Sequence, residues 1–207
     1  MNPRVVVRYA GLILILLYCL APFYWMAASA FRRPSDQFSL SPLPAPPSLT
    51  NFTAVFGPDV GFGRSLVNSI VVAGIATILT LIVGISAAYA LARLRFRFKT
   101  AVAVIIIATS MCPGISLVVP LLKLFTDISW INTYQSMIVP SMSFALPLAV
   151  WNLNAFFRQM PGELEEAAMI DGCTRLQAFR KIIVPLAAPG VFTTAIITFI
   201  TAWNEFI

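Results

Sequence analysis

The chain has 207 residues, of which 59% are hydrophobic and only 11% are charged, and its mean hydropathy is +0.87. Soluble domains carry about 25% charged residues, so this composition excludes an ordinary water-soluble globule, a disordered chain and a nucleic-acid-binding protein. The sequence contains no histidine, which excludes histidine-based catalytic triads, histidine-ligated zinc and histidine pH switches. Its three cysteines lack the spacing of metal ligands, so no metal site is expected.

Five stretches without charged residues are long enough to cross a bilayer, for which a helix needs roughly 20 apolar residues. They predict an all-α, polytopic membrane protein whose single transmembrane domain covers residues 1–207. The expected spans lie at about 9–31, 68–92, 100–122, 134–157 and 182–204.

The positions of the basic residues predict the orientation, because cytoplasmic loops of membrane proteins carry an excess of Lys and Arg. With the N-terminus in the cytoplasm, the outer loops hold only Arg32, Arg33, Arg64 and Lys123. The inner segments then hold the remaining basic residues, which are Arg4, Arg8, Arg93, Arg95, Arg97, Lys99, Arg158, Arg175, Arg180 and Lys181. The beginning of the chain also fits a cleaved signal peptide, but its apolar run is longer than a signal core and favours a retained span.

Proline marks the expected irregular segments. The external loop, residues 32–64, is rich in proline, which favours an extended surface segment over a packed domain. Prolines inside the later spans remove backbone donors and predict kinks. These prolines are Pro113, Pro120, Pro140, Pro147, Pro185 and Pro189.

The connection between the fourth and fifth expected spans, residues 158–181, is the most informative segment. Pro161 suits a first helical turn. Acidic residues follow it, where the helix dipole favours negative charge; they are Glu163, Glu165 and Glu166. Gly172 is placed to end this helix in a left-handed conformation. The sequence therefore predicts a short helix followed by a break.

A second short helix is predicted after the break. Thr174 can cap its N-terminus, and Gln177 completes a capping box. Leu176, Phe179 and Ile183 are expected on one face of it. A rigid loop between two membrane spans would move both spans when a partner protein grips it.

The residues of this segment resemble the EAA loop of ABC importer permeases. Glu166-Ala167-Ala168 is followed by three residues, Gly172, nine residues and then Ile182-Ile183-Val184-Pro185. The family pattern is glutamate-alanine-alanine, three residues, glycine, nine residues, isoleucine, any residue, leucine and proline. Val184 in place of the leucine is the one, conservative, departure.

Other stretches resemble carbohydrate-type permeases, and specifically the second permease subunit of maltose-type sugar transporters. These stretches are Ala88-Tyr89-Ala90-Leu91-Ala92-Arg93, Trp130-Ile131-Asn132-Thr133, Ala145-Leu146-Pro147 and Trp203-Asn204-Glu205-Phe206. The resemblance implies six transmembrane helices, of which the sixth is absent from residues 1–207. It also implies a permease that moves a mono- or oligosaccharide into the cytoplasm by alternating access. Such a permease lies in the cytoplasmic membrane of a bacterium or archaeon.

The resemblance further implies partners: a second homologous permease subunit, two cytoplasmic ABC ATPase subunits and an extracytoplasmic sugar-binding protein, all held at the lipid bilayer. Glu166 would pair with a basic residue of an ATPase, and Gly172 would shape the break. The residues expected to couple to the ATPase are Glu165, Glu166, Ala167, Ala168, Asp171, Gly172 and Pro185. The chain has no GxxxxGK[ST] sequence. We therefore expect no catalytic residues or cofactor in this chain, with ATP and Mg bound by the partner ATPases.

A polar stripe runs along the fifth expected span. Thr194, Thr198, Thr201 and Glu205 recur at helical spacing, and Asn204 adjoins them. Such a stripe can line a sugar pathway, in which hydroxyls and carboxylates exchange hydrogen bonds with the substrate. Alternatively, the threonines bond to their own backbone or to neighbouring helices.

Three other functions remain as alternatives. Importers of non-sugar solutes share the EAA loop, and the flanking sugar-type stretches favour a sugar importer over them. A secondary transporter is disfavoured because no Asp, Glu or His lies inside an expected span, where such groups form proton relays. A membrane enzyme is disfavoured because no paired carboxylates or nucleophile–base pairs occur at membrane depth.

Overall fold

The computed structural model describes residues 3–57 and 60–205. Residues 58 and 59 of the expected external loop, and Phe206, lie outside these ranges. The chain divides into two compact units, residues 1–66 and 67–207. The described residues form helices and connecting segments without strands, which confirms the all-α class.

The first unit contains α1 (Pro3–Ala30), the short 3-10 helix η1 (Pro34–Asp36) and α2 (Thr50–Val55). Its proline-rich loop is ordered around Arg32, which is buried. The Arg32 guanidinium donates to the carbonyls of Ser39 and Ser41 and lies 4.6 Å from the ring centroid of Trp25. In the sequence this arginine is only one of the charges that predict orientation, whereas in the structure its hydrogen bonds order the proline-rich loop.

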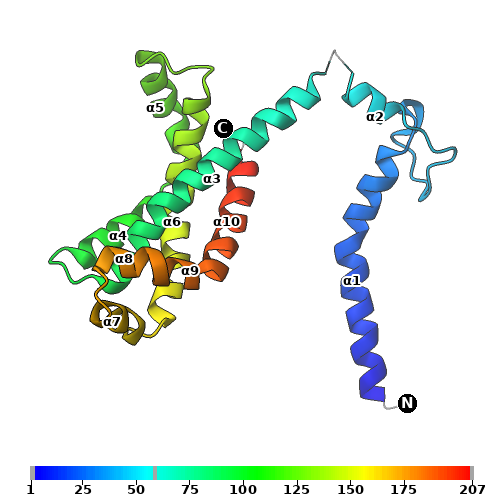
Figure 1. Ribbon diagram of the computed structural model, residues 1–207. Coiled ribbons are helices and arrows are strands. Elements are labelled where there is room, and N and C mark those ends of the chain that lie inside the picture. The colour runs from blue at the N-terminus through cyan, green and yellow to red at the C-terminus, as the bar shows by residue number, and fades with distance from the viewer. Residues whose placement is uncertain (1–2, 58–59, 206–207) are drawn as a thin grey trace. The chain divides into compact units, whose positions relative to one another are not determined.

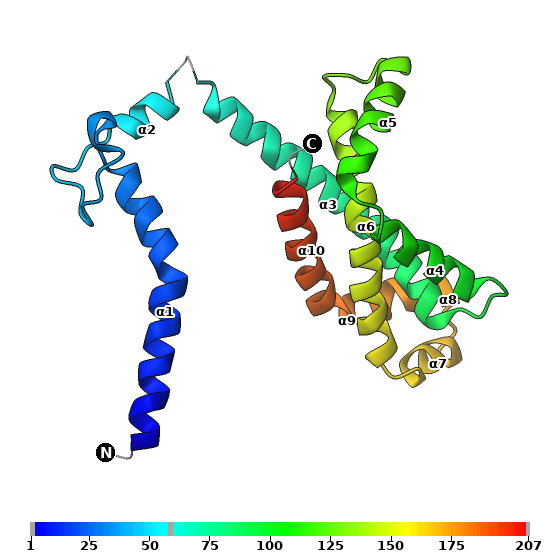
Figure 2. The ribbon, with the colours of Figure 1, turned by 180° about the vertical axis from the view of Figure 1, so that it is seen from behind.

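The second unit is built on three main helices (Figures 1 and 2). They are α3 (Phe62–Arg93), whose residues 67–93 lie in this unit, α6 (Tyr134–Gln159) and α10 (Ala188–Trp203). One buried cluster joins Ala88 and Tyr89 of α3 with Leu153 and Phe157 of α6 and with Ile183. A second cluster joins residues 72, 73 and 76 of α3 with Ile138 of α6 and Ala202 of α10. Three of the five buried residues of the second cluster are alanines, whose small side chains let membrane helices approach closely.

Gly190 shows how close this packing is. A Cβ atom at Gly190 would lie 2.5 Å from a ring carbon of Phe156 in α6. Because real Cβ atoms do not approach other atoms this closely, only glycine allows α10 to lie against α6 at this level. The two helices run antiparallel, so α6 ends and α10 begins at the same end of the unit (Figures 1 and 2).

The expected spans correspond to straight and bent helices. Among the described residues, three helical segments are long and apolar enough to cross a membrane: Val7–Ala30, α3 and α6. Two further spans arise if each of two bent helix pairs crosses as one. The first pair is α4 (Lys99–Ser110) and α5 (Gly114–Asp127), bent by 93°. The second joins Arg175–Leu186 to α10 with a bend of 71°.

Two of the predicted proline kinks coincide with breaks between helices. The third expected span, 100–122, is divided at Pro113, whose extended backbone (ψ 121°) separates α4 from α5. By contrast, Pro120 lies within α5, and Pro140 and Pro147 lie within α6, without ending these helices. The fifth expected span, 182–204, changes direction at Ala187, between Pro185 and Pro189. The helices therefore break near Pro113 and between Pro185 and Pro189, and continue through the other three prolines.

Candidate functional site

The segment between α6 and α10 forms the predicted pair of short helices. The first, α7 (Glu163–Ile170), carries Glu163, Glu165 and Glu166 in its first turn. It ends at Gly172, which has φ +85°. The Gly172 amide donates to the Met169 carbonyl, and the Cys173 amide donates to the Ala168 carbonyl. This is the Schellman pattern of hydrogen bonds, so the predicted left-handed helix end is confirmed.

The second short helix, α8 (Arg175–Ala178), begins with the predicted capping box. The Thr174 amide donates to Gln177 Oε1 at 2.7 Å, and the Gln177 amide donates to Thr174 Oγ1 at 3.3 Å. A π-helical turn, η2 (Phe179–Ile183), and a short helix, α9 (Val184–Leu186), lead from α8 to α10. Leu176 is exposed whereas Phe179 and Ile183 pack against the core, so the expected common face is only partly realised.

The residues predicted to couple to an ATPase fall into two groups. Glu165 and Ala168 are buried within this chain. By contrast, the side of α7 that bears Glu166, Ala167 and Ile170 is exposed, with 85% of Ile170 accessible. Asp171, Gly172 and Pro185 are exposed as well. We call the exposed residues Glu166, Ala167, Ile170, Asp171 and Gly172 the α7 face.

Two residues near the end of α3 hold α7 in place from its buried side. The Tyr89 hydroxyl donates to Glu165 Oε1. Arg93 Nε lies 3.7 Å from Glu165 Oε2, and Arg93 Nη2 donates to the Met160 carbonyl at 2.6 Å. The ion pair is shielded from solvent, since its side chains are only 16% and 8% exposed. We call Tyr89, Arg93 and Glu165 the α7 anchor.

The α7 anchor also reaches the π-helical turn η2 that follows α8. The ring of Tyr89 lies 4.4 Å from that of Phe179 and meets Phe157 of α6 edge-on at 6.1 Å. The end of α3 is therefore packed against the end of α6, against α7 and against the turn that leads into α10. Packed side chains thus connect α7 to α3, to α6 and to the turn that leads into α10.

Sequence reasoning missed the role of Tyr89 and favoured a topological role for Arg93 over one in docking a partner. A signal for both was present, because the two residues lie four apart and share one face of a helix. Both also belong to the Ala88–Arg93 stretch that carries the family resemblance. What the sequence did not contain was the partner, since Tyr89 and Glu165 are 76 residues apart.

The predicted substrate-pathway residues lie on α10 and beyond its end. Thr194 and Thr198 are buried at 1% and 2% exposure, and Thr194 Oγ1 has no hydrogen-bond partner among the described residues. Thr201 Oγ1 donates to the Ile197 carbonyl of its own helix, which agrees with the alternative that these threonines bond to their own backbone. Asn204 and Glu205 are exposed at the end of the helix. Thr194 and Thr198 thus lie within helix packing, Thr201 is half-buried, and Asn204 and Glu205 at the end of the stripe are exposed.

A small polar cavity of about 70 Å³ lies beside this end of α10. Glu205 and Trp203 line it from the C-terminal end of α10. Serine residues from α3 and α6 complete the polar part of the wall: Ser69, Ser136 and Ser141. Within the part of the chain that the structure describes, no group of three or more acidic or cysteine side chains could hold a metal ion. The cavity offers hydroxyls, one carboxylate and an aromatic ring.

Comparisons with known proteins agree with this architecture. The family model described as binding-protein-dependent transport system inner membrane component matches residues 80–207. The trehalose transport system permease protein of Mycobacterium tuberculosis is 41% identical over 192 residues, which cover 93% of this chain and 70% of that protein. The trehalose/maltose transport system permease protein of Thermococcus litoralis is 40% identical over 198 residues, covering 95% and 71%.

A solved structure shares the fold. It is the crystal structure of a bacterial ABC transporter involved in the import of the acidic polysaccharide alginate, with a TM-score of 0.81 and 22% sequence identity. The match covers 98% of this chain and 71% of that chain. Helix order, fold and sequence agree, and the chain belongs to the family of inner membrane permease components of binding-protein-dependent ABC transport systems.

Proposed function

We propose that this chain is a permease subunit of an ATP-driven sugar importer. Relatives that are 41% and 40% identical are named for trehalose and for trehalose and maltose transport. These names support a mono- or oligosaccharide as the substrate, moved into the cytoplasm by alternating access. In this proposal ATP and Mg are bound by two partner ATPases, because the chain has no phosphate-binding loop sequence of its own.

The observation that carries the proposal is the two-sided construction of α7. Its buried side is tied to α3 by the α7 anchor, and its opposite side is exposed. The exposed side combines a carboxylate (Glu166), a small residue (Ala167) and a large apolar residue (Ile170). A partner that covers Ile170 would remove its exposed apolar surface from water, and a basic residue beside it would pair with Glu166. The α7 face is thus suited to a cleft with apolar walls and a basic residue.

Coupling follows from this geometry. An ATPase that grips the α7 face would pull on a helix whose other side is bonded to α3 and whose two ends continue into α6 and α10. Because packed helices move as rigid bodies, closure of the ATPases would reorient all three spans together. The same movement would open and close the polar cavity at the far end of α10, where Glu205, Trp203 and the serines offer hydrogen bonds to a sugar.

The proposal also assigns separate roles to neighbouring residues of the EAA pattern. Glu166, Ala167, Asp171 and Gly172 form the docking side, with Gly172 setting the left-handed end of α7. Glu165 and Ala168 act as positioning residues that fix the orientation of the docking side. Pro185 lies just before the 71° bend into α10 and sets the direction in which movement of the loop is passed on.

Co-purification tests the docking role. The chain is tagged at its N-terminus, the membranes are solubilised gently, and the recovery of ATPase and second permease subunits is measured. We expect both in the wild type and loss of the ATPase in Glu166→Lys. The charge-matched control is Asp127→Lys, because Asp127 is exposed at the end of α5, outside the loop. Equal ATPase recovery in Glu166→Lys and the control would overturn the docking role.

A further inference from the structure

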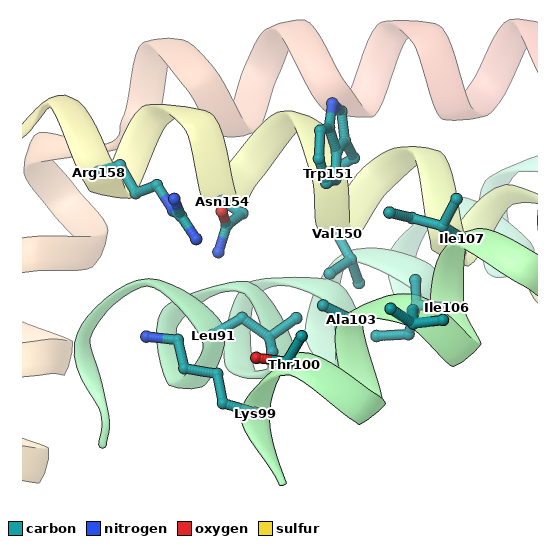
Figure 3. A pocket seen from close by; sticks show the side chains of 11 residues that line it. Leu91, Lys99, Thr100, Ala103, Ile106, Ile107, Val150, Trp151, Asn154 and Arg158 are labelled. Atoms are coloured by element: carbon teal, nitrogen blue, oxygen red, sulfur yellow. The ribbon is translucent and has the colours of Figure 1, made fainter. Parts of the chain in front are cut away.

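A cavity of about 320 Å³ lies between the end of α3, the helix α4 and the last turns of α6 (Figure 3). Most of its wall is apolar and includes Ala103, Ile106 and Val150. One end differs, because Lys99 and Arg158 direct their nitrogen atoms into it from opposite sides (Figure 3). The cavity is therefore amphipathic, with a cationic end and an apolar length.

No carboxylate among the described residues neutralises either cation. Lys99 Nζ donates to the Leu94 carbonyl at 3.2 Å, and Arg158 makes no hydrogen bond or ion pair with any described residue. None of the described residues that line the cavity is acidic. Asn154, at the same end, donates its amide N–H to the Ala88 carbonyl at 3.3 Å. The cationic end therefore lacks a negative partner within the described chain.

The position of the two cations points to the membrane interface. Lys99 is the first residue of α4, and Arg158 lies in the last turn of α6. The ends of membrane helices lie at the level of lipid headgroups, where basic pockets between helices bind anionic heads. The N-terminal end of α4 adds a favourable dipole for an anion. The apolar wall continues from this level along α4 and α6, in the direction of the acyl chains.

We propose that this cavity binds one anionic phospholipid. Its phosphate lies between Lys99 and Arg158, which form charge-assisted hydrogen bonds with the phosphate oxygens. One acyl chain follows the apolar wall past Ala103 and Ile106. The charge complementarity selects an anionic over a zwitterionic lipid, and the apolar length selects a lipid over a free anion. This site is separate from the α7 face and does not depend on the proposed transport activity.

Trp151 lines the same cavity and provides a local reporter. The full chain is reconstituted in bilayers of phosphatidylcholine that contain a minor fraction of brominated lipid, which quenches tryptophan fluorescence on contact. The Trp151 signal is the difference between the wild type and Trp151→Phe. Brominated phosphatidylglycerol is compared with brominated phosphatidylcholine at equal fractions.

We expect stronger quenching of Trp151 by the brominated phosphatidylglycerol than by the brominated phosphatidylcholine. Each of the two cations should contribute a factor of about five to this apparent preference. In Lys99→Gln/Arg158→Gln the preference should fall towards unity. The matched control is Arg97→Gln/Arg180→Gln, which removes the same charge from two exposed arginines outside the cavity and should keep the preference.

Three results would overturn the proposal. Equal quenching by the two lipids in the wild type shows that no anionic lipid is selected, and this comparison needs no variant to fold. Absence of quenching by either lipid shows that lipid does not enter the cavity. An unchanged preference in Lys99→Gln/Arg158→Gln shows that these two cations do not bind the lipid headgroup.

Discussion

The α7 anchor provides the sharpest test of how the loop is held. We consider Arg93→Met, which keeps the length of the side chain and removes its charge and donors. Glu165 would then remain buried with only the Tyr89 hydroxyl as a partner. Leaving one member of a buried pair without its partner costs about 3–5 kcal/mol. The pair is slightly accessible, at 16% and 8% exposure, and we therefore expect the lower end, about 3 kcal/mol.

The loss should appear as local opening of α7 rather than unfolding of the whole chain, because α7 is short and its other side is exposed. Hydrogen exchange of the α7 amides, measured by mass spectrometry in lipid nanodiscs, reports this opening. A change of about 3 kcal/mol corresponds to exchange that is faster by roughly 100-fold. Amides in the middle of α3 and α6 should exchange as in the wild type.

A double-mutant cycle separates the ion pair from other effects. Arg93→Met with Glu165→Gln leaves no uncompensated charge, so α7 should exchange more slowly in the double variant than in Arg93→Met alone. We expect a coupling energy of about 1–3 kcal/mol. The control is Arg97→Met, because Arg97 is exposed and its guanidinium lies over the ring of Phe98. If the α7 amides exchange as slowly in Arg93→Met as in the wild type, the ion pair of the anchor has no part in holding the loop.

Further predictions concern glycines and one helix cap. Gly190→Ala should lower the melting temperature, since its Cβ would meet the Phe156 ring at 2.5 Å and overpacking costs about 1–3 kcal/mol; Gly74→Ala, with no atom within 4 Å, is the control and should leave the melting temperature unchanged or raise it. Gly172→Asp should leave ATP hydrolysis in the reconstituted transporter while reducing sugar uptake, because φ +85° strains a side-chain-bearing residue; normal uptake would contradict the role of the break. Thr174→Ala should speed exchange of the α8 amides by several-fold, as loss of a cap costs about 1 kcal/mol, and unchanged exchange would show that packing alone holds α8.

Features that depend on neighbours in the chain were predictable. The ends of α7 and α8 were predicted from Gly172, Thr174 and Gln177, since helix caps involve residues only a few positions apart. The membrane-type helices were predicted from stretches without charged residues, because roughly 20 consecutive apolar residues are enough for a helix to cross a bilayer. The same local reasoning located the proline-linked break at Pro113.

Features that depend on distant contacts were not predictable. Glu165 and Glu166 are adjacent and chemically identical, yet one is buried against α3 and the other is exposed. Which of them turns inward depends on the rotation of α7 against Tyr89 and Arg93, more than 70 residues away. The burial of Thr194 and Thr198 in α10 was not predictable either, because it results from packing against neighbouring helices and not from the spacing of the threonines.

The sequence by itself therefore determined the class of protein, the membrane-type helices and the local shape of the loop. Hydropathy, helix periodicity and caps are all short-range properties of the chain. Only the tertiary structure decided which face of α7 is available to a partner, and that Lys99 and Arg158 share one cavity. Those two residues are 59 positions apart, and only the packing of α4 against α6 brings their charges together.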